Sequence, residues 1–456
     1  MKHKFLFILL FSLVLEGMVT TQAVAGDYVH QVNTLIGTKG TGLTSGYLYP
    51  GATYPYGMVQ FTPSYFSKRS GFVINQLSGG GCEHMGNFPT FPVKGKLKMS
   101  PDNILNYRIN VSEEKGHAGY YEAMVQEDIK AKLTVTERTG MASYEYPADQ
   151  QYGTIIIGGG ISATPIEQAA IVITAPNKCE GYAEGGNFCG LRTPYKVYFV
   201  AEFDTDAFET GTWKREELMP NTTFAEGEYS GVYFTFDVNK KKNIQYKIGV
   251  SYVSVENARE NLKAENAEWD FQKIQNQAEA KWNHYLGMIE VEGTNPDRTT
   301  QFYTHLYRSF IHPNVCSDVN GEYMGADFRV HKSRSKHYTS FSNWDTYRTQ
   351  IQLLSMLDPE VASDIVISHQ LFAEQSGGSF PRWVMANIET GVMQGDPTPI
   401  LIANAYAFGA RNYDPKPIFK IMRKGAEEPG SKSQDVETRP GLKQYLDKGY
   451  YNASIQ

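Results

Sequence analysis

The sequence predicts a β-sandwich that is followed by linker helices and then by a helical domain. From residue 28 to about residue 252, short apolar or alternating segments are rich in β-branched and aromatic residues, with Gly, Pro and Asn between them. Residues 256–286 contain neither Pro nor Gly and are rich in Ala, Glu, Lys and Gln, which favour helices. Longer amphipathic segments follow. Many short strands without intervening helices are typical of a sandwich.

The first 25 residues have the pattern of a secretory signal peptide. Two lysines precede an apolar run at 5–15, and small residues at 23–25 form a cleavage site. The run is too short to span a membrane, and no later segment reaches that length. We expect the mature chain to begin near Gly26 and to be exported, to the periplasm or the extracellular space.

Composition excludes some partners. The 456 residues include 43 Lys+Arg and 49 Asp+Glu, a net charge of -6, so no basic field attracts nucleic acid or acidic lipid. Hydrophobic residues at 41% and charged residues at 20% are typical of a globular protein. The 30 Tyr and 24 Phe suit both strand packing and surfaces that stack on carbohydrate.

The strand signals define a first domain at residues 26–255. The clearest predicted strands lie in "YGTIIIGGG", "YKVYFVAEFD", "GVYFTFDV" and "NIQYKIGVSYVSV". Cysteine usage adds little to this domain. Cys179 and Cys189 bracket a Gly-rich segment that we expect to be a flexible loop, so they can pair, whereas Cys82 and Cys316 are expected to be buried thiols. None of the four has zinc-like spacing.

Linker helices are expected at 256–295, as one helix or two, with Trp269, Ile274 and Trp282 as the buried stripe. A helical domain is expected at 296–456. Its predicted helical segments are residues 298–313, 345–357, 359–375, 397–410 and 415–428.

Two polar and aromatic stretches of the helical domain resemble parts of a binding site. In "FSNWDTYRTQ", Asp345 is either an ordinary helix N-cap or, with Trp344, faces a pocket. In "GGSFPRWVMANIETGVMQGDPTP", Arg382, Trp383 and Glu389 lie amid Gly and Pro.

An Arg, two Trp and carboxylates in such loops suit sugar recognition, because rings stack on a pyranose and charged groups hold its hydroxyls. The alternative for each residue is structural: Trp383 can seal a helix end, and Glu389 can be a solvated turn acid. Glycoside hydrolysis needs two carboxylates. The sequence selects no pair from Asp318, Asp327, Asp345, Glu389 and Asp396.

Nine runs in this order resemble glycoside hydrolase family 92, the calcium-dependent exo-acting α-mannosidases. They are "VNTLIGTKGTG", "YPGATYPYGMVQFTP", "LSGGGC", "GGNFCG", "FYTHLYRSFIHPN", "SDVNGEYMGAD", "FSNWDTYR", "PRWVMANIETGVMQGDP" and "GLKQYLDKGYYNA". The resemblance implies a sandwich joined by linker helices to an (α/α)6 toroid, with the site between them. It also implies inverting hydrolysis of mannosidic linkages in glycans, calcium that holds the mannose hydroxyls, and Trp344 and Asp345 as contacts of the terminal sugar.

The chain departs from the family pattern at several positions. Leu43 and residues 72–76 occupy positions where the family usually has His-containing segments. Ile388 occupies a position where Asn is common in the family. Asn404 and Asn87 occupy positions where the family usually or often has Asp. These differences leave the linkage preference open.

The family's proton-donor run, Glu-Gly-Asn-Ala-Trp, and its base run, Gly-Asn-Asp-Asp, do not occur in the chain. The resemblance therefore implies an incomplete toroid, about a third of it by typical domain sizes. It also implies that the chain holds no catalytic residue and few calcium ligands, and that a downstream chain completes the site. The alternative hypothesis is a secreted carbohydrate-binding module without catalysis.

Overall fold

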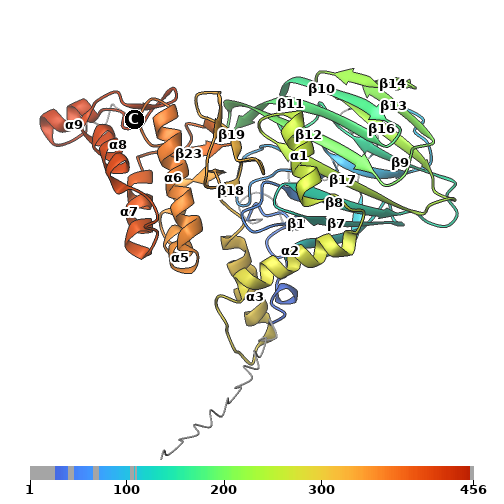
Figure 1. The fold of residues 1–456 in the computed structure, drawn as a ribbon, viewed down its shortest axis with the longest axis horizontal. Coiled ribbons are helices and arrows are strands. Elements are labelled where there is room, and N and C mark those ends of the chain that lie inside the picture. The colour runs from blue at the N-terminus through green and yellow to red at the C-terminus, as the bar shows by residue number, and fades with distance from the viewer. Residues whose placement is uncertain (1–25, 40–45, 65–70, 103–106, 108–109, 452–456) are drawn as a thin grey trace, which may run out of the picture.

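The computed structural model describes residues 26–39, 46–64, 71–102, 107 and 110–451. The expected signal peptide and Leu43 lie outside these residues. A β-rich part and a helical part lie side by side along the long axis of the molecule, as Figure 1 shows. No helix within the described ranges is long and apolar enough to cross a membrane.

The β-rich part is a sandwich of two antiparallel sheets, as the sequence predicts. The first sheet has the order β1 (Ala52–Thr53), β2 (Gln60–Pro63), β3 (Phe72–Val73), β4 (Thr90–Lys94), β9 (Tyr152–Ile157), β16 (Ser230–Asp237), β13 (Glu209–Lys214) and β14 (Glu217–Pro220). The second has the order β15 (Phe224–Glu226), β10 (Ile166–Ala175), β11 (Lys178–Phe188), β12 (Leu191–Phe203), β17 (Asn243–Ser251), β8 (Thr139–Glu145), β7 (Ile129–Val135), β6 (Tyr120–Val125) and β5 (Val111–His117).

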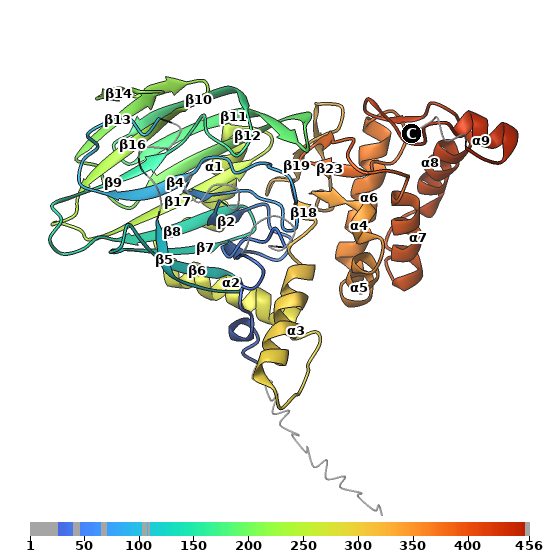
Figure 2. The same ribbon diagram turned by 180° about the vertical axis from the view of Figure 1, so that it is seen from behind.

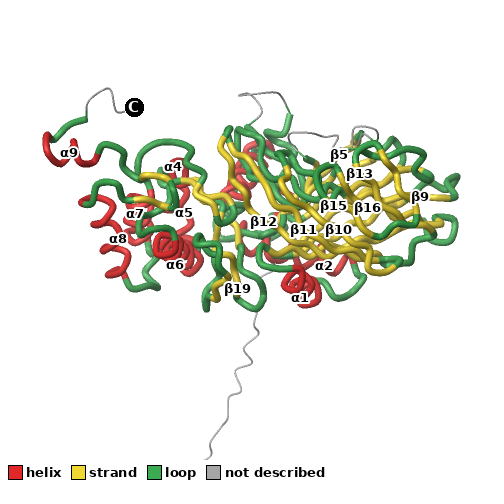
Figure 3. The backbone as a smooth tube through the Cα atoms, turned by 90° about the horizontal axis from the view of Figure 1, so that it is seen from above, coloured by secondary structure: helices red, strands yellow, loops and turns green. Residues whose placement is uncertain are grey.

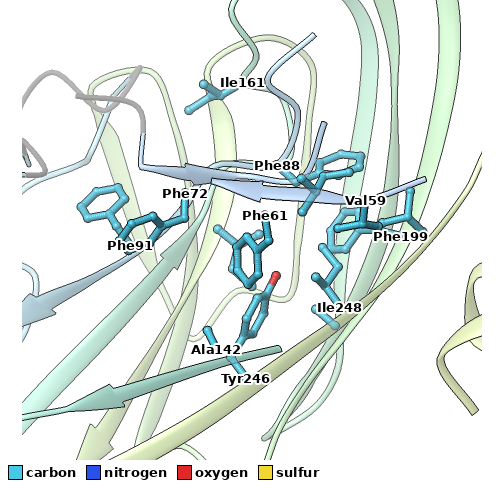
Figure 4. Packing of buried hydrophobic residues seen from close by; sticks show 14 of the residues in the cluster. Val59, Phe61, Phe72, Phe88, Phe91, Ala142, Ile161, Phe199, Tyr246 and Ile248 are labelled. Atoms are coloured by element: carbon cyan, nitrogen blue, oxygen red, sulfur yellow. The ribbon is translucent and has the colours of Figure 1, made fainter. Parts of the chain in front are cut away.

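Aromatic and β-branched side chains fill the space between the sheets. In Figure 4 the Phe61 ring of β2 lies against Tyr246 of β17, and their ring centroids are 6.3 Å apart. Phe88 and Phe199 lie closer, at 4.3 Å. Since successive strand residues point to opposite faces, each strand gives alternate side chains to this core.

The predicted linker helices are two: α1 (Val255–Glu265), capped by Ser254, and α2 (Phe271–Leu286), capped by Asp270. Both pack on the second sheet, α1 against β12 and β17 and α2 against β7. Ile274 and Trp282 are buried as expected. The expectation for Trp269 was wrong, because it lies in the break between the helices, at the surface, with Lys247 Nζ 4.3 Å from its ring centre.

Each segment predicted to be helical contains a helix, and several begin at a proline, which is tolerated in a first turn. The helices are α3 (Pro296–Ser309), α4 (Asn343–Thr346), α5 (Gln350–Leu357), α6 (Pro359–Gln375), α7 (Thr398–Phe408), α8 (Pro415–Glu427) and α9 (Leu442–Lys448), and η1 (Val29–Gln31) is a short 3-10 helix near the N-terminus. Seen from above in Figure 3, α5 to α9 form an open group beside the sandwich. Across the described residues they do not close into a ring.

Short strands connect these helices. They are β18 (Asn314–Val315) with β21 (Tyr338–Thr339), β19 (Glu322–Met324) with β20 (Val330–Lys332), β22 (Phe341–Ser342) with β23 (Trp383–Met385) and β24 (Ile388–Glu389), and β25 (Lys432–Ser433) with β26 (Val436–Glu437).

The expected pairing of Cys179 with Cys189 and the expected free thiol at Cys82 were wrong, whereas Cys316 is a buried thiol as expected. Cys82 and Cys189 form the disulfide, while Cys179 and Cys316 are buried free thiols. The segment expected to be a flexible loop is strand β11, and ten residues of extended chain separate Cys179 from Cys189 by about 30 Å.

Candidate functional site

A cavity of about 500 Å³ lies between the sandwich and the helical domain. One wall comes from sandwich loops, in particular residues 77–82 and the end of β11. The opposite wall comes from the start of α4 and α5, from β23 and from the loop after β24. Segments far apart in the sequence therefore enclose one space, in the size range of small-ligand sites.

Two histidines hold the sandwich wall in place. Leu77 N–H donates to His84 Nε2 at 2.8 Å, and His84 Nδ1 donates to the Cys82 carbonyl at 2.6 Å. Ser78 N–H donates to His312 Nε2 at 2.7 Å. A ring nitrogen that accepts a hydrogen bond carries no proton, so both imidazoles are neutral. Burial lowers the pKa of His84 and of His312 to about 4, in keeping with this.

The disulfide fixes the same wall covalently. Cys82 ends the 77–82 loop and Cys189 follows β11, and both line the cavity. Phe188, next to Cys189, also lines it. The ring of Phe188 packs on Trp383 of the helical domain, with 4.6 Å between centroids, so the aromatic pair joins the two walls.

A small sheet brings the two predicted motifs together. Ser342 of β22 pairs with Trp383 of β23, and Asn343 N–H donates to the Arg382 carbonyl at 3.2 Å. Asp345 follows in the first turn of α4 and is exposed at the cavity rim, where Ser342 Oγ donates to its carboxylate. The N-cap position belongs to Ser342, so the capping alternative for Asp345 was wrong.

Of the five predicted binding residues, Asp345 and Trp383 line the cavity. Trp344 is half-buried and lies outside the lining, where its ring centre is 4.3 Å from the Arg348 guanidinium carbon. Arg382 is buried beside the lining, and its guanidinium donates to the Met393 carbonyl. Met393 itself lines the cavity.

Glu389 is buried within its own hairpin. Its carboxylate accepts backbone N–H bonds from Arg382 at 2.6 Å, Gly391 at 3.0 Å and Trp383 at 3.3 Å. Burial raises the pKa of Glu389, although these bonds act in the opposite direction. Three backbone donors occupy the carboxylate, which therefore shapes the β23–β24 hairpin and the position of Trp383.

Asp345 is the single carboxylate among the described residues that line the cavity. The other candidate acids are engaged elsewhere: Asp318 with Ser251, Asn257 and Asn261, Asp327 with His331, and Asp396 with Arg439. Calcium takes six to eight oxygen ligands, usually with several carboxylates. The described lining does not supply such a set, so it does not fit a calcium ion by itself.

Sequence reasoning missed His84, His312 and Phe188. Each lies in or beside a run that resembles the family, since His84 follows "LSGGGC", His312 is in "FYTHLYRSFIHPN" and Phe188 is in "GGNFCG". The residue types did not indicate that these two imidazoles accept hydrogen bonds from backbone N–H groups of the 77–82 loop. For His312 this loop is also distant in the sequence.

Family models match nearly the whole described chain. The glycosyl hydrolase family 92 N-terminal domain matches residues 31–251, and the glycosyl hydrolase family 92 catalytic domain matches residues 257–456. This protein belongs to glycosyl hydrolase family 92.

The chain is also similar to individual proteins. An uncharacterized secreted glycosidase from Arthroderma benhamiae is 25% identical over 489 residues, covering 97% of this chain and 58% of the relative. The family 92 α-mannosidase BT3965 from Bacteroides thetaiotaomicron matches with a TM-score of 0.82 and 24% identity, covering 92% of this chain and 58% of that one. The inverting mannosidase BT2199 from the same organism has a TM-score of 0.80 and 24% identity, covering 94% and 59%. The chain thus spans less than two thirds of the length of these relatives.

Proposed function

We propose that the protein is part of an exported, exo-acting α-mannosidase that removes mannose from glycans with inversion, outside the cytoplasm. The observation that carries the proposal is the cavity between the two domains, with Asp345 at its rim and Trp383 in its wall. Family membership and the structural likeness to α-mannosidases support it. A further solved structure of BT3965 is a complex with mannoimidazole, which gives a suitable probe.

We assign the recognition of the terminal mannose to both walls. The Asp345 carboxylate accepts hydrogen bonds from neighbouring sugar hydroxyls, and such charge-assisted bonds are roughly twice as strong as neutral ones. The Phe188–Trp383 pair offers an apolar surface to the ring carbons. Three of the predicted residues lie outside the lining: Trp344, Arg382 and Glu389. Arg382 and Glu389 hold the hairpin that carries Trp383, and Trp344 lies beside Arg348.

Catalysis needs a second carboxylate and, by the family's pattern, calcium. When bound, calcium would supply positive charge that holds the sugar hydroxyls. Because the described lining contains one carboxylate, we assign the acid, the base and most calcium ligands to a further polypeptide segment outside this chain. This chain by itself then binds sugar without turning it over.

The same further segment would cover the outer helices. Large apolar side chains are exposed on three successive helices: Ile400, Tyr406 and Phe408 of α7, Phe419 of α8, and Tyr445 and Leu446 of α9. We infer that these side chains belong to one apolar face, because a large exposed apolar surface is typical of an interface. Packing of downstream helices on this face would complete a toroid.

The second candidate function is a carbohydrate-binding module without catalysis. The single carboxylate in the described lining favours it. One experiment separates the two candidate functions. If the chain is part of a longer enzyme, supplying the downstream helices should produce hydrolysis of mannosides, whereas a binding module should stay inactive.

The test uses binding and turnover together. Calorimetric titration of mannoimidazole into the chain should show binding that weakens about tenfold or more in Asp345→Asn, as expected for loss of a charged hydrogen-bonding group. Asp435→Asn, which removes an exposed carboxylate at the β25–β26 turn, is the matched control and should bind normally. Equal affinity in all three proteins would refute the assignment. Release of mannose from α-mannosides by this chain alone would place acid and base in it.

A further inference from the structure

Two histidines and a glutamate, none of which lines the cavity, meet where η1, β5 and α2 come together. One ring nitrogen each of His30 and His117 and one carboxylate oxygen of Glu279 all lie within 4.8 Å of one another. His30 belongs to the 3-10 helix η1 near the N-terminus, His117 ends β5, and Glu279 is in the middle of α2. Figure 2 shows β5, β6 and α2 in this region of the molecule.

The elements that carry the three side chains are held rigidly. Tyr28 N–H and Val29 N–H both donate to Asn283 Oδ1 of α2, at 2.9 and 3.0 Å. Val29 is buried, so both its backbone and its side chain fix the start of η1 beside α2. A cluster on fixed backbone needs only side-chain rotation to bind a ligand.

The hydrogen bonds around the cluster show which ring nitrogen of each histidine faces a carboxylate. Asp27 Oδ1 lies 2.6 Å from His30 Nδ1, so this nitrogen donates and the Nε2 lone pair of a neutral ring stays free. A carboxylate on the second ring nitrogen is the usual support of a metal-binding histidine. His117 Nε2 lies 2.8 Å from Glu279 Oε1 and donates to it, and Gln275 Nε2 donates to the same oxygen at 2.7 Å. A cation would take the place of the proton between His117 and Glu279, so its binding releases that proton.

The donor set selects the kind of ion. Two imidazoles and one carboxylate suit zinc and similar first-row ions, whereas calcium and magnesium prefer oxygen donors throughout. Tetrahedral zinc with bonds of about 2.1 Å places its ligands about 3.4 Å apart. The His117–Glu279 separation of 2.8 Å and the spread of 4.8 Å lie on either side of that value.

We propose that His30, His117 and Glu279 bind a zinc-type divalent cation that ties the N-terminal segment to β5 and α2, with Asp27 orienting His30. His117 and Glu279 are largely buried and His30 is half-exposed, so an open fourth position faces solvent and takes water. The site is structural and does not depend on the sugar cavity.

The competing interpretation is a pair of plain histidine–carboxylate contacts, Asp27 with His30 and Glu279 with His117. It predicts no metal binding and equal behaviour in zinc, calcium and chelator. The two interpretations therefore separate in a direct binding experiment.

The experiment uses the untagged chain after chelator treatment and dialysis. Zinc titration by calorimetry should give one ion per chain, and cobalt should give the visible absorption bands of a four-coordinate site. Saturating zinc should raise the Tm by about 2–4 °C, while calcium should leave it unchanged. Absence of zinc binding would overturn the proposal.

Single variants locate the site. His30→Gln, which changes a half-exposed side chain and preserves the fold, and Glu279→Gln should each abolish the zinc-dependent Tm rise. Asp27→Asn should weaken zinc binding about tenfold, as for other supporting carboxylates. His305→Gln, an exposed histidine on α3, is the matched control and should behave as the parent chain. Zinc binding that survives His30→Gln and Glu279→Gln, or that is lost in His305→Gln, would contradict the assignment.

Discussion

In the sandwich, large apolar side chains face one another across two sheets, whereas several on the outer helices of the second domain face solvent. Phe61 is fully buried between the sheets, while Phe419 of α8 is 61% exposed. Two sheets can close a core by themselves, but a helix hairpin buries its apolar stripe only against neighbouring helices. The comparison teaches that the sandwich encloses an aromatic core between its two sheets, whereas the outer helices leave several large side chains in solvent.

The two walls of the cavity repeat this contrast. A disulfide and two neutral histidines hold the sandwich wall, through residues distant in the sequence. The helical wall is held by a local hairpin in which Glu389 accepts backbone bonds from its near neighbours. One wall is therefore sensitive to redox state and acid, and the other to the loss of a single carboxylate.

A matched pair of substitutions, one in the sandwich core and one on α8, tests the contrast between the two regions with the largest expected effect. Phe61→Ala should lower the free energy of unfolding by about 3–5 kcal/mol, because it leaves a cavity in a close-packed core. Phe419→Ala should change it by less than about 0.5 kcal/mol, because the side chain is already in water. Urea unfolding followed by circular dichroism measures both. Similar losses in the two variants would mean that the α8 face is covered in solution.

Removal of the disulfide has the next largest expected effect on the free energy of unfolding. Removing it with the double substitution Cys82→Ala and Cys189→Ala should cost about 2–5 kcal/mol, since it closes a long loop in the unfolded chain. It should also weaken mannoimidazole binding, because both residues line the cavity. The double substitution Cys179→Ala and Cys316→Ala, at the two free thiols, is the control and should leave binding unchanged. If the variant without the disulfide binds mannoimidazole normally, the disulfide does not shape the sugar site.

The hairpin carboxylate has a smaller expected effect. Glu389→Gln removes the charge that three backbone N–H groups share and should destabilise the chain by about 1–3 kcal/mol. Thermal unfolding measures this, with Glu428→Gln at the exposed end of α8 as the control. A parent-like Tm together with lost sugar binding would show that Glu389 contacts the ligand directly.

Acid should loosen the sandwich wall. The pKa of His84 and of His312 is about 4 in the fold and about 6.5 in an unfolded chain, so between these values the unfolded state binds more protons. Stability should therefore fall as pH decreases from 6.5 to 4. Burial also lowers the pKa of His337 to about 3 and that of His369 to about 4, so these two groups act in the same direction. Asp364 acts in the opposite direction, because burial raises its pKa to about 6, as do the buried carboxyls whose pKa is raised: Asp318, Glu389 and Asp396.

The measurement for this prediction is Tm against pH. The parent chain should lose stability from pH 6.5 to 4, and His312→Gln should start lower at pH 7 but show a flatter dependence. An unchanged slope in the variant would exclude His312 as a contributor.

Much of the fold was predictable because periodicity reports burial directly. The change from strand to helix near residue 255 and the helices that begin at Pro296, Pro359 and Pro415 follow from local residue types. The disulfide did not follow, because connectivity depends on which strands pair. The glycines between Cys179 and Cys189 suggested a flexible loop, yet β11 pairs on both sides and its glycines fit the sheet.

The candidate site was predictable in part. The sequence selected five residues, because aromatic and charged side chains in loops suit sugar recognition: Trp344, Asp345, Arg382, Trp383 and Glu389. Of these, Asp345 and Trp383 line the cavity. It could not separate these two from the other three. Glu389, for example, accepts from backbone N–H groups, which every residue type except Pro has. The separation of lining from supporting residues is a property of three-dimensional geometry.

The central claim is that the cavity between the two regions holds a terminal mannose. The most direct measurement is a crystal structure of the chain with mannoimidazole. We predict ligand density between residues 77–82 and Trp383, with a ligand hydroxyl within hydrogen-bonding distance of the Asp345 carboxylate. Density at any other surface, or an empty cavity at saturating ligand, would contradict the account.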